Sequence, residues 1–155
     1  RGESVYNSMT EHEAEVRKLE SQDRNINQIG GGPGRGFYQY EVIDNEYGTK
    51  GSGASKTALV RYYQLNKKYG IDTSDKHKKE LLNIDSKNPD FTKLSSGLQK
   101  EIFFADKEMG LVKWDDVASG KVSLKDAYLD GHFAASEEAK IAKGPYYDKT
   151  IGNRK

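Results

Sequence analysis

The residues best suited to chemistry lie close together between Leu19 and Glu41, in the segment LESQDRNINQIGGGPGRGFYQYE. Glu20 supplies a carboxylate, a loop dense in glycine follows it, and an aromatic run containing Gln39 closes the segment. A carboxylic acid that stays protonated can give its proton to a leaving oxygen. A glutamine amide can orient the acid or its substrate by hydrogen bonds. The segment therefore has the residue types of a general-acid site.

Glu20 needs an element that positions it, and the preceding residues predict a helix. Thr10 and Glu13 have the spacing of a capping box, and an apolar stripe follows them. We predict a helix over about residues 10–21, with Glu20 in its last turn. There a negative charge meets the negative end of the helix dipole, which favours the protonated acid. A solvated glutamate on a charged helix would have the same sequence, so placement alone leaves both interpretations open.

The glycine-rich loop separates this helix end from the aromatic run. Glycine permits positive φ and close backbone approach, so residues 30–36, GGGPGRG, predict a shaped loop or a tight hairpin. Residues 37–40 are predicted as a short strand or as the first turn of a helix. Any sheet is expected to lie within residues 27–47.

Helices dominate the rest of the chain. Apolar residues at helical spacing predict a long helix over residues 54–69, which Ser52 caps and Gly70 ends. Further helices are predicted over residues 76–82, 94–109 and 123–135. We therefore expect a mainly α fold of the α+β type, with a small β-hairpin or loop region around residues 27–47. The whole chain, residues 1–155, is predicted to form a single domain with flexible ends near residues 1–8 and 144–155.

The composition excludes several classes of function. The chain of 155 residues has 25 Lys and Arg against 24 Asp and Glu. This near-neutral charge creates no strong positive potential that would attract nucleic acid or an anionic membrane. It has no cysteine, which excludes disulfides and thiolate metal sites. No apolar run approaches the roughly 20 residues that a membrane span needs. We therefore expect neither nucleic acid nor a membrane span among its partners.

Two glycine-rich segments resemble nucleotide-binding motifs but do not match them. The segment GSGASKT at residues 51–57 resembles a Walker loop, but that motif needs glycine directly before the lysine, where this chain has Ser55. The segment GGGPGRG lacks the strand–turn–helix setting of a dinucleotide fingerprint. The three histidines lie far apart at positions 12, 77 and 132, without the pairing of a metal site. We predict no cofactor and no metal.

The order of residues in the opening segment resembles a known signature. Glu20-Ser21 at a helix end, followed by a polar loop and by the tetrapeptide GFYQ at residues 36–39, is similar to the lysozyme-like superfamily, in particular its soluble lytic transglycosylases and phage virion-associated lysozymes. In those proteins a Glu-Ser pair ends a helix and a Gly-Leu-Met-Gln type segment follows. The later segment DGHFAAS, residues 130–136, is a weaker likeness to phage-encoded members. The chain departs from the pattern after Gln39, where the family's Met-Gln-x-x-Pro continuation is missing.

The resemblance implies a peptidoglycan-degrading glycosidase, either a lytic transglycosylase or a muramidase, with Glu20 as single general acid/base. The implied substrate-binding residues are Ser21, Tyr38, Gln39 and Glu41. The implied partners are the glycan strand of peptidoglycan and other virion or tail proteins. A phage origin is implied too, with action in the virion or in the bacterial periplasm and cell wall.

Four alternatives stay open. Many glycosidases use a second carboxylate, for which the sequence offers Glu41, Asp44 and Glu46. If none of these faces Glu20, the resemblance favours a transglycosylase, whose substrate supplies the remaining groups. A non-catalytic structural or glycan-binding virion module could retain the same fold, and an unrelated helical domain would have no site in this segment.

Overall fold

The computed structural model describes residues 13, 14, 16–110, 116 and 119–122. Contacts divide the chain into two units, one formed by Val16–Asp106 and the other by Arg1–Glu15 with Lys107–Lys155. The candidate site lies within the first unit. The predicted flexible ends and the helix predicted over residues 123–135 lie outside the described residues, and with the expectation of a single domain they stay predictions.

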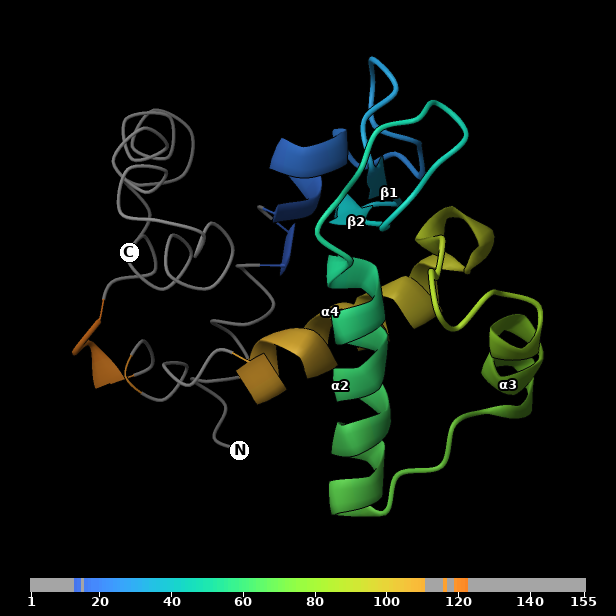
Figure 1. Ribbon diagram of the computed structural model, residues 1–155. Helices are drawn as coiled ribbons and strands as arrows, with labels where there is room; N and C mark the ends of the chain where they lie inside the picture. The colour runs from blue at the N-terminus through green and yellow to red at the C-terminus, as the bar shows by residue number, and fades with distance from the viewer. Residues whose placement is uncertain (1–12, 15, 111–115, 117–118, 123–155) are drawn as a thin grey trace. The chain divides into compact units, whose positions relative to one another are not determined.

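The elements of the described chain confirm a mainly α fold with a small sheet (Figure 1). Residues 16–21 are helical, as predicted for the segment before the loop. The elements that follow are β1 (Gly34–Arg35), β2 (Tyr40–Glu41), α2 (Ala54–Tyr69), α3 (Asp75–Leu82), the 3₁₀ helix η1 (Phe91–Lys93) and α4 (Ser96–Gly110). No helix among the described residues is long and apolar enough to cross a bilayer.

The sheet is a hairpin of two short antiparallel strands. Gly34 pairs with Glu41 and Arg35 with Tyr40, so the sheet lies in the predicted region. Residues 36–39 form the connecting turn, and only Tyr40 of the aromatic run belongs to a strand, which corrects the expectation of a strand or helix over residues 37–40. Gly36 has φ 82°, and a Cβ there would lie 2.3 Å from the side-chain oxygen of Gln99. Both constraints require glycine.

Backbone groups at the helix ends explain two small errors in the predicted boundaries. The N-cap residue of α2 is Gly53 in the left-handed region, while the hydroxyl of Ser52 accepts a 3.3 Å hydrogen bond from the N–H of Ala54. Gly70 ends α2 as predicted, with φ 62°. The helix predicted from residue 94 begins at Ser96, because Leu94 is extended and closes η1.

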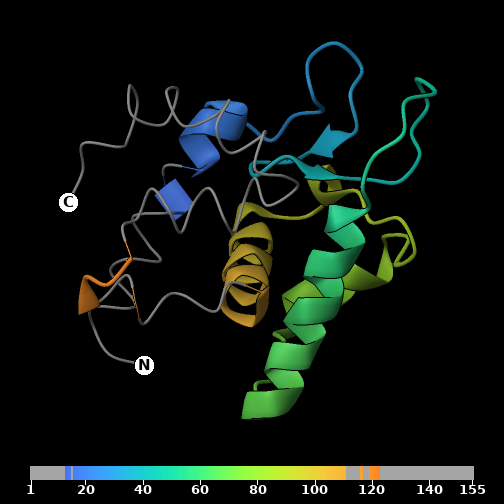
Figure 2. The same ribbon diagram turned by 60° about the vertical axis from the view of Figure 1, so that its left-hand side comes forward.

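The core of this unit joins the hairpin to the helices. The ring of Tyr38 stacks on Phe103 of α4 with centroids 4.5 Å apart, and Tyr40 meets Phe91 of η1 edge-on at 5.5 Å. The buried apolar residues are Val16, Tyr38, Tyr40, Val42, Ala58, Leu59, Tyr62, Leu65, Phe91, Leu94, Leu98, Ile102, Phe103 and Ala105. In both views, the hairpin lies beyond the N-terminal end of α2 (Figures 1 and 2).

A buried polar network connects the hairpin to two helices. The hydroxyl of Tyr40 donates a 2.6 Å hydrogen bond to Asp106 of α4, whose other oxygen accepts from Arg61 of α2 at 2.8 Å. Burial raises the pKa of Tyr40 well above its ordinary value, and the charge of Asp106 raises it further. Tyr40 is therefore held neutral, as a donor.

Replacing Tyr40 with Phe tests this network. The variant leaves a buried carboxylate short of one donor, so we expect the free energy of unfolding at pH 7 to fall by about 1.5–3 kcal/mol. The control Tyr69→Phe, at a residue 55% exposed, should change it by less than about 0.5 kcal/mol.

The pH dependence gives an independent readout. Because the pKa of Tyr40 is raised in the folded state, the unfolded state loses this proton first, and stability falls as the pH rises above about 10. We expect denaturant titrations to show a shallower fall for Tyr40→Phe than for the wild type. Equal slopes would contradict the assigned network.

Candidate functional site

Ser21 joins the end of the first helix to the hairpin turn. Its side chain is buried, and its hydroxyl donates a 2.7 Å hydrogen bond to the carbonyl of Phe37 while accepting from the N–H of Arg24 at 3.2 Å. Gln22 and Asp23 have φ of 54° and 61°, which ends the helix directly after Ser21. The structure thus brings the Glu-Ser pair and the GFYQ turn together, across 16 positions of sequence.

The backbone N–H of Phe37 is held by Gln99 of α4. The N–H of Phe37 donates to the side-chain oxygen of Gln99 at 3.1 Å. The amide nitrogen of Gln99 donates to the carbonyl of Leu94 at 2.9 Å and to the side-chain oxygen of Asn25 at 3.1 Å. Gln99 is 1% exposed, so its orientation is fixed by these three bonds. Both polar groups of the Phe37 backbone are therefore bonded to buried side chains.

Arg17 holds the ring of Phe37. Its guanidinium carbon lies 3.9 Å from the ring centroid, within the range of a cation–π contact. The same guanidinium donates to the hydroxyl of Tyr38 at 3.3 Å and to Ser96 Oγ at 3.0 Å, and its Nε pairs with Asp23. Burial opposes the charge of Arg17, but the hydrogen bonds to Asp23 and Tyr38 outweigh it, so the pKa of Arg17 lies above its ordinary value. The positive charge is thus kept beside the turn.

Glu20 occupies the position that the sequence predicts. It lies in the last turn of the helix, next to the buried Ser21, and its side chain is partly exposed. A carboxyl group in this position combines access from solvent with a main chain that Ser21 fixes against the turn. A general acid must also lie within hydrogen-bond reach of the group that it protonates.

Three of the predicted binding residues make contacts that belong to the fold itself. Tyr38 is 1% exposed, and its ring belongs to the core stack with Phe103. The amide nitrogen of Gln39 donates to the carbonyls of Ile26 at 2.9 Å and Gly36 at 2.8 Å, which closes the turn onto the loop before it. Ser21 likewise acts through the backbone of the turn.

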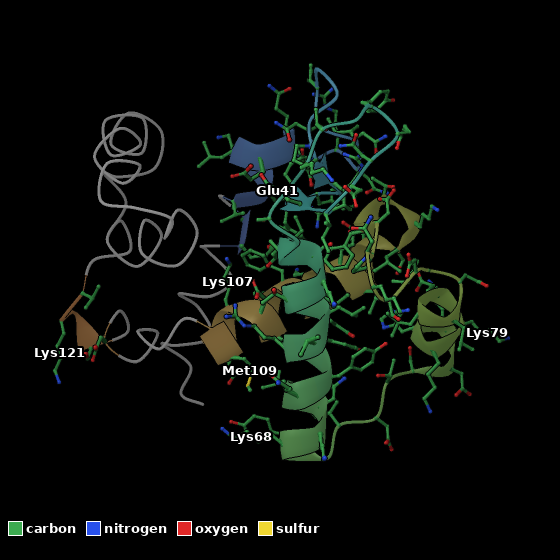
Figure 3. The ribbon with its side chains drawn as sticks, in the orientation of Figure 1. Glu41, Lys68, Lys79, Lys107, Met109 and Lys121 are labelled. Carbon is green, nitrogen blue, oxygen red and sulfur yellow. The ribbon has the colours of Figure 1, made fainter. Side chains whose placement is uncertain are left out.

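The three candidates for a second carboxylate each have another partner. Glu41 accepts a 2.9 Å hydrogen bond from the N–H of Ser52 and lies near the start of α2 (Figure 3). Asp44 bonds to Lys50 at 2.9 Å. A carboxylate oxygen of Glu46 lies 3.9 Å from a guanidinium nitrogen of Arg35.

The residues that sequence reasoning missed are Arg17, Asn25 and Gln99. Arg17 had a local signal, because a residue one helical turn before Glu20 shares its face. Asn25 and Gln99 had none, since Gln99 bonds to groups 62 and 74 positions away.

Comparisons of the chain with models of known protein families, with curated proteins and with solved structures found no match.

Replacing Ser21 with Ala tests the link between helix and turn. The variant leaves the carbonyl of Phe37 without its side-chain donor, so we expect the free energy of unfolding to fall by about 1–3 kcal/mol. Ser86→Ala, at an exposed position, is the control and should stay within about 0.5 kcal/mol of the wild type. Denaturant titration measures both, and an unaffected Ser21→Ala would show that the bond is dispensable.

Proposed function

We propose that this chain is a peptidoglycan-degrading glycosidase of the lytic transglycosylase type, with Glu20 as its general acid/base. The observation that supports the proposal is the hydrogen bond from Ser21 Oγ to the carbonyl of Phe37. It holds together the two halves of the signature that resembles the lysozyme-like superfamily. Glu20 is partly exposed at this junction, where a glycan strand can reach it.

One carboxyl group can serve both halves of the reaction. The protonated Glu20 gives its proton to the oxygen that leaves with the GlcNAc residue, and the bond from that oxygen to C1 of MurNAc breaks. The N-acetyl group of the substrate stabilises the resulting oxocarbenium-like centre. The Glu20 carboxylate then takes the proton of the C6 hydroxyl of MurNAc, whose oxygen bonds to C1 and closes the anhydro ring. The acid is regenerated without a water molecule.

The contacts of the other carboxylates favour this single-acid mechanism over a two-carboxylate muramidase. Glu41, Asp44 and Glu46 lie beside Ser52, Lys50 and Arg35 respectively. In the two-carboxylate mechanisms the second group must lie across the substrate from the acid. To act there, each of these groups would have to face Glu20 in addition to the contact that it already makes.

The resemblance also suggests the biological setting. We propose a phage-encoded protein of the virion or tail, which opens the glycan strand of the cell wall during infection and works with other virion proteins in the periplasm or cell wall. The alternative is a structural or glycan-binding virion module without catalysis, and the following experiment separates the two.

The substitution Glu20→Gln removes the proton and keeps the shape of the side chain. We expect the rate at which the full chain clears a suspension of purified peptidoglycan to fall at least ~100-fold, the smaller end of what a general acid contributes. Glu101→Gln, which removes an exposed carboxylate of α4, is the matched control and should retain the wild-type rate. A Glu20→Gln variant as fast as the wild type would refute the assignment, and a wild type without activity would favour the structural module.

The substitution Glu41→Gln, combined with product analysis, distinguishes the two mechanisms. The amide oxygen can still accept from Ser52, so the fold is kept. We expect Glu41→Gln to retain cleavage and mass spectrometry of the products to find anhydro-muramyl ends. Reducing ends, together with a loss as large as that of Glu20→Gln, would indicate a two-carboxylate muramidase instead.

A further inference from the structure

Phe37 is partly exposed, yet both of its backbone polar groups and its ring make specific contacts. Its N–H bonds to Gln99, its carbonyl to Ser21, and its ring lies against the guanidinium of Arg17. These three contacts come from the first helix and from α4. Phe37 is nevertheless only partly buried, whereas its neighbour Tyr38 is 1% exposed. The fold thus fixes the backbone that carries this ring, places Arg17 against one of its faces, and leaves the residue partly exposed.

Such a ring is prepared for binding. Ordering a side chain costs conformational entropy, and a group already ordered in the free protein spares that cost when a ligand arrives. The face of an aromatic ring is negatively polarised and attracts weakly positive hydrogens, such as the C–H groups along one face of a pyranose. A partly exposed ring on a fixed backbone, with Arg17 against one face, therefore suits the stacking of a sugar on its other face.

We propose that Phe37 is the residue on which a sugar ring of the glycan strand stacks beside Glu20, and that Ser21 and Gln99 are positioning residues for it. This inference rests on the proposed function for its ligand. It assigns the stacking to Phe37 because the ring of Tyr38, which the sequence favoured, lies in the core. The carbonyl of Phe37 bonds to the residue that follows Glu20, so a sugar on this ring would lie close to the acid.

Binding to insoluble peptidoglycan tests the proposal without turnover. All variants carry Glu20→Gln in the full chain, and co-sedimentation with purified peptidoglycan gives the dissociation constant. We expect Phe37→Leu, which keeps apolar volume but removes the ring, to raise that constant about tenfold, as loss of one aromatic stacking contact would. Tyr47→Ala is the control, because it removes an aromatic ring that is 59% exposed on the loop after the hairpin. It should bind as the parent does.

Phe37→Trp adds a readout that a purely structural role would not change. It should keep binding, and its tryptophan emission should shift when a GlcNAc–MurNAc tetrasaccharide is added, beyond any change in the parent, whose only tryptophan is Trp114. This variant also decides the question if Phe37→Leu fails to fold. Unchanged binding of a folded Phe37→Leu, or no emission shift in Phe37→Trp, would overturn the proposal.

The outcome is separable from that of the proposed function. If the wild type cleaves peptidoglycan while folded Phe37→Leu binds normally, only the stacking assignment is wrong. If the wild type does not cleave but Phe37→Leu still loses binding about tenfold, Phe37 is a sugar-stacking residue of a non-catalytic module, and the proposed catalysis is wrong.

Discussion

The need to satisfy both backbone polar groups of one residue, Phe37, organises the candidate site. A buried N–H or carbonyl without a partner costs free energy, so the turn is stable only where Ser21 and Gln99 can both reach it. Gly36 permits that approach, since any side chain there would collide with Gln99. The backbone of a single residue therefore ties the helix that bears Glu20 to the hairpin and to α4.

Buried charged and polar side chains also hold the hairpin to the helices, alongside the apolar core. Only 34% of the chain is hydrophobic, and polar side chains accordingly enter the interior of the described unit. Asp106 joins the hairpin to α2 and α4 through Tyr40 and Arg61. Arg35 of β1 is 2% exposed and donates to the carbonyls of Gly32 and Gly34. Breaking one member of such a network leaves its partner buried and short of a bond, so the region around the hairpin resists rearrangement.

Local patterns predicted the helices because spacing of apolar residues and terminal glycines report directly on backbone geometry. Gly70 ended α2 where expected, and the hairpin lay within residues 27–47. The aromatic run was harder, since alternating aromatic residues suit a strand, a helix and a turn alike. Tyr38 is buried while Phe37 is partly exposed. The burial of Tyr38 depends on its stacking with Phe103, which lies 65 positions further along the chain. The role of Gln99 depends on equally distant groups, so no local pattern could predict it.

A crystal structure of Glu20→Gln bound to a GlcNAc–MurNAc oligosaccharide tests the proposed roles of Glu20 and Phe37 most directly, because it locates the substrate relative to the turn. We expect a glycosidic oxygen within about 3 Å of the side chain of residue 20, with a neighbouring sugar stacked on the ring of Phe37. An oligosaccharide bound on another face of the unit, with its glycosidic bonds remote from residue 20, would contradict these roles.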